Sequence, residues 1–484
     1  MLENSHPTII QGGMGVGVSH WPLARAVSAC GQLGVVSGTA LDLLLHRKLQ
    51  DGDPGGHLRR ALDRLPLPGV AARLLANSFL PEGRKPGRPY KGLPMVAAHP
   101  TRESAEWLVA ANFAEVFLAK EGHAGPIGIN YLHKVQLPTL PSLFGAILAG
   151  VDYVLMGAGI PMDIPGAIDS LARGEPVRLQ LEVEDALPGE MFWSEFVPRE
   201  WFDGPLPPLG RPFFLAIVSS AVLAMALARK ASGRVDGFVV ENASAGGHNA
   251  PPRGTPARNE RGEPVFGPRD VPDIAKIRSL GLPFWLAGSE AGPERLAEAR
   301  AQGANGVQVG SAFAFCEESG IDPSIKARVL AESVAGTLDV FTDPLASPTG
   351  FPFKVVGVAG TVSESEVYQG RPRLCDLGYL RRLYRKPDGT IGYRCPGEPV
   401  NLYASKGGAL ADTVGRKCVC NGLMATIGRA QIQPGGLAEP ALVTAGQDAR
   451  RLARFLDPGA HGYTVADVLR HLLGQSFATT ATTP

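Results

Sequence analysis

The chain has 484 residues, more than one domain of the commonest size, but a single α/β barrel with insertions can absorb this length. Its 60 glycines and 42 prolines are about 21% of the chain, below the ~25–30% of low-complexity sequences, so the composition indicates a loop-rich globular enzyme. With 47 basic and 46 acidic residues the net charge is +1, which excludes a bulk electrostatic attraction to nucleic acid or to an anionic membrane.

Nothing near the N-terminus resembles a signal peptide, because Glu3 is an early acid and neither a basic nor an apolar region follows it. The longest apolar run, residues 213–228, is interrupted by Ser219 and Ser220 and is shorter than the ~20 residues of a membrane-spanning helix. We therefore expect a cytoplasmic protein that does not enter a membrane.

Short β-rich runs alternate with helical stretches through the first 340 residues, which is typical of βα units around a parallel sheet. Residues 115–119 could form one more strand. The pattern favours a TIM (β/α)8 barrel, although strand counting leaves a doubly wound open sheet possible. The eight predicted strands cover residues 8–11, 33–36, 127–131, 153–156, 213–218, 237–241, 284–287 and 307–309.

The remaining length is assigned to two insertions and an extension. Residues 41–125 hold a Pro/Gly/Arg-rich loop and a predicted helix at 102–112, and residues 174–212 are rich in acids, prolines and aromatics. The β-α alternation ends after residue 345. We therefore predict a barrel of residues 1–345 and a C-terminal extension of residues 346–484, of unknown role, packed on it. Predicted helices in the extension cover residues 379–385, 448–455 and 465–473.

Glycine and serine follow the seventh and eighth predicted strands, as Gly288-Ser289 and Gly310-Ser311. In a barrel these loops commonly bind phosphate, because glycine lets backbone N–H groups approach an anion. Either loop alone could be merely a tight turn. Two such loops in consecutive βα units, however, favour an anion-binding site. Residues 12–17 lack the GxGxxG spacing and no Walker motif occurs, so a mononucleotide is favoured over a dinucleotide.

His248 follows Gly246 and Gly247 in the loop after the predicted strand 237–241. Histidine titrates near neutrality and is the commonest general base, and the two glycines would let the backbone lie against a flat ring. A histidine in a loop can also be merely solvated. Its position one unit before the phosphate loops makes His248 the leading catalytic candidate.

Four cysteines, Cys375, Cys395, Cys418 and Cys420, lie in the extension. Four thiolates suit zinc or an iron–sulfur cluster, but their spacing contains no CxxC knuckle. A redox pair at Cys418 and Cys420 and plain reduced thiols remain as alternatives. We predict no metal site.

Together these motifs resemble the nitronate monooxygenases, formerly called 2-nitropropane dioxygenases, whose relatives include FMN-dependent enoyl-acyl-carrier-protein reductases. The resemblance is carried by residues 9–15, 245–248, 287–289 and 303–311, and covers residues 8 to about 350. It implies a TIM barrel with non-covalent FMN at the carboxyl ends of the strands, and it implies that His248 is the catalytic histidine. The implied FMN contacts are Gly12, Gly13, Met14 and Asn130 at the isoalloxazine, Gly246 and Gly247 near the cofactor, and Gly288, Ser289, Gly310 and Ser311 at its phosphate.

The implied activity is the oxidation of alkyl nitronates by O2 to carbonyl compounds and nitrite, with a small-molecule substrate and O2 as partners. The alternative is NAD(P)H-dependent reduction of an enoyl thioester in fatty-acid or polyketide synthesis, with an acyl-carrier protein as a possible partner. A basic cluster of Arg381, Arg382, Arg385 and Lys386 could meet such an acidic domain. The family often has an acid where Ser244 stands, and this departure bears on the substrate more than on the cofactor.

Overall fold

The computed structural model describes residues 6–202 and 206–477, so residues 203–205 of the second predicted insertion lie outside the described residues. At its centre, eight strands pair in parallel in the order β1-β11-β10-β9-β8-β4-β3-β2. A bridge between Ile10 and Leu33 joins β1 to β2 and closes the ring. The strands are β1 (Ile9–Gln11), β2 (Gly34–Ser37), β3 (Ile127–Leu132), β4 (Tyr153–Gly157), β8 (Phe213–Val218), β9 (Gly237–Glu241), β10 (Phe284–Ala287) and β11 (Gly306–Val309).

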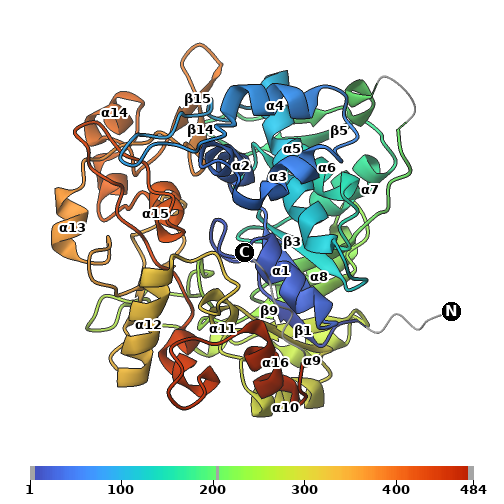
Figure 1. The fold of residues 1–484 in the computed structure, drawn as a ribbon, viewed down its shortest axis with the longest axis vertical. Helices are drawn as coiled ribbons and strands as arrows, with labels where there is room; N and C mark the ends of the chain where they lie inside the picture. Colours follow the sequence, from blue (N-terminus) through green and yellow to red (C-terminus); the bar gives the residue numbers. More distant parts are fainter. Residues whose placement is uncertain (1–5, 203–205, 478–484) are drawn as a thin grey trace.

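The predicted TIM barrel is therefore confirmed, and each predicted strand agrees with the structure to within one residue at either end. Helices surround the strands (Figure 1). They are α1 (Trp21–Ala29), α5 (Arg102–Lys120), α6 (Thr139–Leu148), α7 (Ile164–Ala172), α8 (Ala221–Lys230), α9 (Ile274–Arg278), α10 (Pro293–Ala301), α11 (Ser311–Ala314) and α12 (Pro323–Ala335).

Helix α5 lies between β2 and β3 in the chain and packs against α1 and α6. Its Thr101 side chain accepts a hydrogen bond from the N–H of Ser104, which fixes the helix start. Residues 115–119 lie in this helix, so the possible extra strand was wrong. We propose that α5 is the ring helix between β2 and β3, and that the inserted part of the chain is residues 41–101. That part contains α2 (Leu41–Gln50), α3 (His57–Leu62), α4 (Val70–Ser78) and the 3-10 helix Pro54–Gly56.

The segment between β4 and β8 leaves the barrel after α7. There β5 (Val177–Leu181) pairs with β7 (Phe192–Phe196) in antiparallel fashion, and the short β6 (Val183–Glu184) joins a strand of the C-terminal extension. A 3-10 helix covers Pro198–Trp201, and another, Pro268–Asp270, lies between β9 and α9.

The C-terminal extension begins within a two-stranded sheet of β12 (Val340–Asp343) and β13 (Phe353–Val356). The predicted helix at residues 448–455 is a 3-10 helix, Gln447–Phe455, and the helix predicted at 465–473 is confirmed as α16 (Val465–Leu473). The other elements are α13 (Ser365–Gly370), β14 (Arg382–Arg385), β15 (Ile391–Arg394), α14 (Val400–Ser405), the 3-10 helix Leu410–Thr413 and α15 (Val419–Thr426).

The predicted helix at residues 379–385 is wrong, because residues 382–385 form β14. This strand pairs with β15 across a turn in which the N–H of Gly389 donates to the carbonyl of Lys386 at 3.0 Å. It also pairs with β6, 200 residues earlier in the chain. Long-range pairing has overridden the helix propensity of arginine and leucine.

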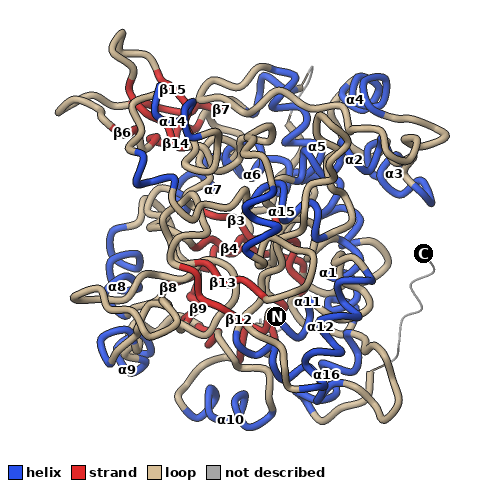
Figure 2. The backbone as a smooth tube through the Cα atoms, turned by 90° about the vertical axis from the view of Figure 1, so that its left-hand side faces the viewer, coloured by secondary structure: helices blue, strands red, loops and turns tan. Residues whose placement is uncertain are grey.

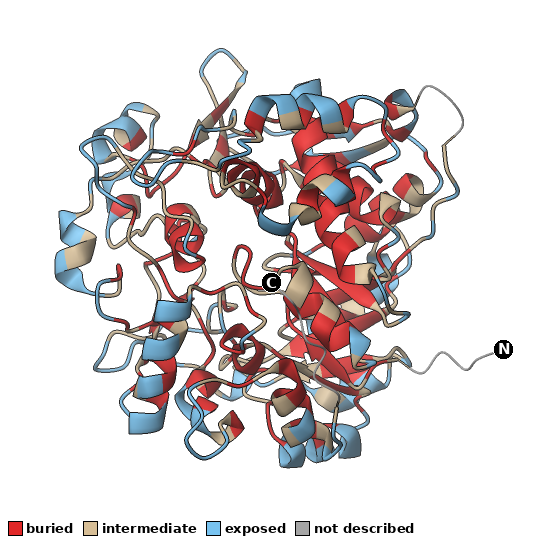
Figure 3. Ribbon diagram, in the orientation of Figure 1, coloured by how far each residue is buried: buried red, intermediate tan, exposed pale blue. Residues whose placement is uncertain are grey.

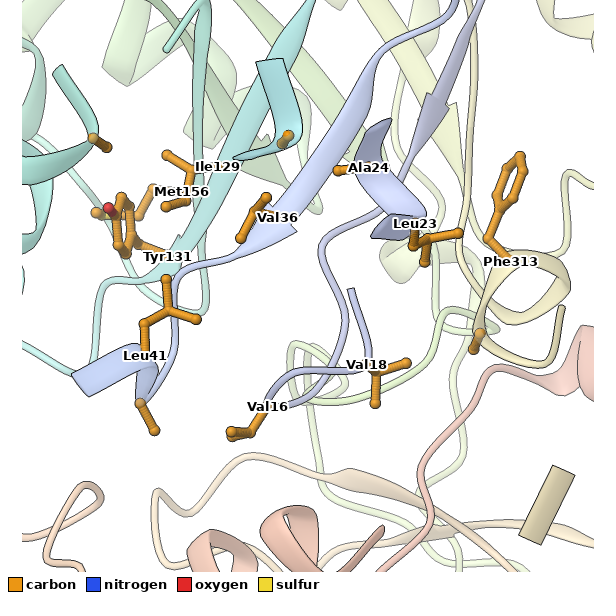
Figure 4. Close-up of a cluster of buried hydrophobic side chains, with 14 of the residues drawn as sticks. Val16, Val18, Leu23, Ala24, Val36, Leu41, Ile129, Tyr131, Met156 and Phe313 are labelled. Atoms are coloured by element: carbon orange, nitrogen blue, oxygen red, sulfur yellow. The ribbon is translucent and has the colours of Figure 1, made fainter. Parts of the chain in front are cut away.

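The core has two layers. Inside the barrel, strand residues such as Val35, Leu155, Leu215 and Trp285 pack on one another. The larger outer layer lies between strands and helices, and Figure 4 shows Val36, Ile129 and Met156 within it. Figure 3 shows that the barrel strands, α5 and α15 are mostly buried. In the described part of the chain, no helix combines the length and apolarity needed to span a bilayer.

Candidate active site

A large cavity lies at the carboxyl ends of the barrel strands, with about 1540 Å³ of space between atoms when its open mouth is included. Every site residue predicted from the sequence lines it: Gly12, Gly13, Met14, Asn130, Gly246, Gly247, His248, Gly288, Ser289, Gly310 and Ser311.

The C-terminal extension supplies the facing wall, which the sequence did not predict. Helix α15 lies over the barrel end near β3 and β4 (Figure 2), and its side chains reach the cavity. This wall is largely apolar, apart from the Tyr379 hydroxyl, the Cys420 thiol, Thr444 and Asp448. The extension residues that line the cavity are Phe353, Leu377, Tyr379, Leu380, Val419, Cys420, Leu423, Thr444, Ala445, Gly446 and Asp448.

The two glycine–serine loops present free backbone donors to the cavity. Within residues 6–202 and 206–477, the N–H groups of Gly288, Ser289 and Gly310 make no hydrogen bond to protein. Gly288 has φ +105° and Ser289 has φ +55°, a conformation that is uncommon for serine. Unpaired N–H groups in such a turn form a concave site that suits an anion.

Two further non-glycine residues with positive φ, Ala40 and Ala158, also line the cavity. Strained backbone of this kind gathers at ligand sites, where the surrounding structure holds it in place. Gln308 adds a buried side-chain oxygen, Oε1, that has no partner among the described residues. A bound group with an N–H or O–H donor would satisfy this oxygen, so the lining fits a polar, anionic cofactor.

The loop that carries His248 is held by the extension. The N–H of Asn249 donates to the carbonyl of Pro352 at 2.9 Å, and the N–H of Lys354 donates to the carbonyl of Gly247 at 3.0 Å. The N–H of Gly247 in turn donates to Thr444 Oγ1 at 3.2 Å. His248 is therefore fixed by residues far along the chain and is not a mobile loop residue.

The His248 imidazole uses one nitrogen for protein contact. Nε2 lies 2.7 Å from Ser347 Oγ, which is itself 2.9 Å from Thr349 Oγ1. Nδ1 forms no hydrogen bond within the described chain, and the Phe353 ring packs edge-on with its centroid 4.7 Å from that of the imidazole. Burial lowers the pKa of His248 to about 4, so the ring is neutral at physiological pH.

Glu241 ends strand β9 and lines the cavity, and the sequence reasoning missed it. Burial raises the pKa of this carboxyl group to about 8, against the opposing charge of Lys354. Burial also lowers the pKa of Lys354 to about 8, and its Nζ donates to Thr342 Oγ1 at 2.8 Å. The available signal for Glu241 was its place as the last residue of a barrel strand, directly before the His248 loop.

The basic cluster of the extension makes internal contacts. Arg382 pairs with Glu184 at 3.1 Å and Arg385 with Glu190 at 2.7 Å. Arg381 donates to the carbonyl of Val96 at 2.7 Å. Arg382 and Arg385 therefore hold β14 against the excursion between β4 and β8, and Arg381 contacts the first insertion, so these three arginines have partners within the fold.

No set of three histidine, cysteine or acidic side chains in the described segments is arranged to hold a metal ion. Comparison with known sequences matches residues 212–345 to the family of nitronate monooxygenases. No curated protein sequence matches the chain.

Among solved structures, FabK from Thermotoga maritima has a TM-score of 0.50 and 16% identity, over 98% of this chain and 93% of that chain. The nitroalkane oxidase from Streptomyces ansochromogenes has a TM-score of 0.47 and 15% identity, over 98% and 96%. At 16% identity the likeness to FabK shows a shared fold. The match over residues 212–345 confirms the predicted resemblance to the nitronate monooxygenases, and the protein is an enzyme, a flavin-dependent oxidoreductase.

Proposed function

We propose that the flavin is FMN and that its phosphate binds the loops at Gly288, Ser289, Gly310 and Ser311. The unpaired N–H groups of these loops support this assignment, because a phosphate would satisfy them. The Ser311 hydroxyl accepts the N–H of Gly446 at 2.8 Å and keeps its own hydrogen for a ligand oxygen.

We propose that the ring system lies against Gly12, Gly13, Met14 and Asn130, with Gly246 and Gly247 near the cofactor. Gly13 packs so closely on Asn130 that a Cβ at this position would lie 2.4 Å from the Cβ of Asn130. The orphaned Gln308 Oε1 offers an acceptor to an N–H or O–H group of the cofactor. When bound, FMN supplies two-electron oxidation and return to the oxidised state with O2.

The reaction we propose is the oxidation of an alkyl nitronate by O2 to a carbonyl compound and nitrite. The observation that carries it is a neutral, partly buried His248 with Nδ1 free at the cavity. In the tautomer that carries its proton on Nε2, the Nε2–H donates to Ser347 Oγ and Nδ1 keeps its lone pair for a carbon-bound proton of a nitroalkane. Ser347 acts as a positioning residue that holds the ring in this orientation.

Anaerobic mixing of the oxidised enzyme with a nitronate, and separately with NADH and NADPH, tests this function. Bleaching of the flavin absorbance by the nitronate alone is the expected result. Bleaching by a pyridine nucleotide alone would contradict it. A colourless protein that also fails to take up added FMN would contradict the cofactor assignment.

A second candidate, reduction of an enoyl thioester with NAD(P)H, is supported by the apolar wall of the extension. Leu377, Leu380, Val419 and Leu423 line the cavity and would suit an acyl chain better than a small nitronate. An acyl-carrier partner is less well supported, because Arg381, Arg382 and Arg385 have partners within the fold. Oxidation of NADPH that depends on a crotonyl thioester would distinguish this activity.

A further inference from the structure

A second cavity lies within the C-terminal extension and is lined mainly by cations. It lies between α13, at the left edge of Figure 1, and the segment that precedes α15. Among the described residues it shares no lining residue with the large cavity, and no carboxylate lines it. Its polar lining consists of Tyr368, Gln369, Arg371, Arg373, Arg416 and Lys417, apart from one thiol. We refer to it as the basic cavity.

Two of the four cations in the basic cavity lie near carboxylates. Arg371 donates to both oxygens of Glu439, from Nε at 2.6 Å and from Nη2 at 2.8 Å. Lys417 Nζ lies 3.8 Å from a carboxylate oxygen of Asp343, which is too far for a hydrogen bond. The charge of Arg371 is therefore balanced closely, and that of Lys417 only loosely.

The other two cations, Arg373 and Arg416, are held by neutral groups. Arg373 Nη2 donates to the carbonyl of Thr413 at 2.6 Å and to the Tyr368 hydroxyl at 3.2 Å. Arg416 Nη1 donates to the carbonyl of Ser347 at 2.7 Å. Within residues 6–202 and 206–477, no carboxylate oxygen lies within 4.0 Å of either guanidinium group. Four cations thus face two carboxylates, and the basic cavity keeps a surplus of two positive charges.

The same side chains keep hydrogen-bond donors that no protein group uses. Arg373 Nε, Arg416 Nη2 and Lys417 Nζ make no hydrogen bond within the described chain. Lys417 Nζ instead lies over the Tyr368 ring, 4.2 Å from its centroid. Burial lowers the pKa of Lys417 and of Arg416, because both charges are partly removed from water. A bound anion would offset this loss of hydration.

We propose that the basic cavity binds a dianionic phosphate group, either inorganic phosphate or a phosphomonoester, at a site separate from the glycine–serine loops. A phosphomonoester carries a charge of about −1.5 to −2 at pH 7 and three acceptor oxygens. This charge matches the surplus of two positive charges, and the oxygens match the three side chains with unused donors. A carboxylate supplies only one negative charge, and the planar fork of arginine suits phosphate geometry.

The basic cavity lies close to the segment that positions His248. Arg416 holds the carbonyl of Ser347, and the hydroxyl of Ser347 lies 2.7 Å from His248 Nε2. Cys418 lines the basic cavity, and the next residue, Val419, lines the large cavity. A phosphate bound at Arg416 would therefore lie behind the extension wall of the candidate active site.

Isothermal titration calorimetry of the FMN-saturated protein with inorganic phosphate tests the proposal, with sodium chloride keeping the ionic strength constant. We expect one phosphate per chain and no release of FMN. Two matched pairs of ligands then identify the source of the phosphate group: coenzyme A against dephospho-coenzyme A, and NADP⁺ against NAD⁺. Tighter binding of the phosphorylated member of either pair assigns the site to that ligand, and equal binding within both pairs assigns it to the free ion. Absence of phosphate binding, or phosphate that displaces FMN, overturns the proposal.

Two variants locate the phosphate. Lys417→Met should weaken phosphate binding at least ~10-fold, the usual loss of one charge-assisted hydrogen bond. Lys230→Met removes the same charge from the exposed end of α8 and should bind phosphate as the parent does. Gln369→Glu adds a carboxylate to the lining and should also weaken binding at least ~10-fold by repulsion, whereas the neutral Gln369→Met should change the affinity little. If Lys417→Met or Gln369→Glu keeps the phosphate affinity of the parent, the proposal is wrong.

Hydrogen exchange of the unaltered protein does not depend on variants that fold. Phosphate should slow exchange in residues 361–373 and 410–418, which carry the lining of the basic cavity, relative to sodium chloride of equal ionic strength. Slowing confined to residues 288–311 would place the phosphate at the glycine–serine loops and overturn the proposal. Because heat and exchange are the readouts, the result is independent of whether the enzyme oxidises nitronates.

Discussion

At the residue scale, His248, Glu241 and Lys354 are three ionisable groups that burial moves toward their neutral forms. With both pKa values at about 8, Glu241 is mostly protonated and neutral at pH 7, whereas Lys354 keeps most of its positive charge. His248 and Glu241 therefore add little charge to the cavity lining, and local hydrogen bonds must contribute to the recognition of a polar substrate.

His248→Ala should lower kcat/KM for a neutral nitroalkane by ~10²–10⁴-fold, the usual contribution of a general base. The loss should be smaller for a preformed nitronate, whose carbon-bound proton is already gone. Steady-state kinetics with both forms provides the test, with the exposed His461→Ala as control. Equal losses of kcat/KM for the nitroalkane and the nitronate would show that His248 does not accept the carbon-bound proton.

The pH dependence follows from the same group. Because the pKa of His248 is about 4, the ring stays neutral between pH 6 and 8 and turnover should be constant over this range. Below about pH 5 a growing fraction of the ring is protonated, and turnover should fall. The folded-state pKa lies below the ordinary 6.5, so stability from the neutral ring is present above pH 6.5 and is lost as pH falls toward 4.

Gly34 lets strand β2 approach helix α1, because a Cβ on Gly34 would lie 1.9 Å from the carbonyl oxygen of Ala24. Gly34→Ala should destabilise the protein by about 3 kcal/mol through this overlap with backbone. The midpoint of urea unfolding measures the effect. Gly370→Ala, where a Cβ meets nothing within 4 Å, should change it little.

At the scale of elements, the His248 loop and the extension segment at Thr444, Ala445 and Gly446 are packed backbone to backbone. A Cβ on Gly246 would lie 2.6 Å from the nitrogen of Gly446 and 2.8 Å from the carbonyl carbon of Ala445. The two segments could not keep their present contact with a larger residue at position 246.

Gly246→Ala should therefore weaken FMN binding at least ~10-fold, which corresponds to about 1.4 kcal/mol. Titration of the apoprotein with FMN, followed by fluorescence, measures this affinity. Gly267→Ala lies on the same long loop with nothing within 4 Å of its Cβ and should bind FMN as the parent does. If Gly246→Ala binds FMN with unchanged affinity, the contact between the two loops does not contribute to cofactor binding and the prediction is wrong.

Much of the barrel could be predicted because each strand is a short apolar run that ends in glycine or a polar residue, and this signal is local. The helix predicted at residues 379–385 failed because β14 depends on β6 and β15. The glycine loops and His248 were recognisable as motifs. The role of Gln308 was not, although it lies within the motif of residues 303–311, because the motif does not show that its side-chain oxygen is buried without a partner. Ser347 was not recognisable either, because it meets His248 only in the folded chain, 99 residues away.

At the scale of the whole molecule, Asp42 joins the first insertion to the extension through the Tyr379 hydroxyl. Burial raises the pKa of Asp42 from 3.8 to about 6. Between pH 4 and 6 the folded protein therefore binds a proton that the unfolded chain does not, so stability from this group is greatest below pH 4 and falls as pH rises to 6.

Asp42→Asn should remove this slope. The stability of the parent relative to the variant should fall by up to about 3 kcal/mol as pH rises from 4 to 6, because one pKa unit corresponds to about 1.4 kcal/mol. Urea unfolding at the two pH values measures the difference. The exposed Asp63→Asn is the control, and identical slopes in Asp42→Asn and the parent would contradict the linkage.

The contacts of the His248 loop with residues 352–354 and 444–447 also bear on when the site is assembled during synthesis. The barrel strands and both glycine–serine loops are complete once residue 311 has left the ribosome, but the partners that hold the histidine emerge more than 40 and 130 residues later. A nascent chain should therefore acquire its barrel well before it can turn over a substrate. The extension must therefore fold onto the barrel before the site around His248 is complete.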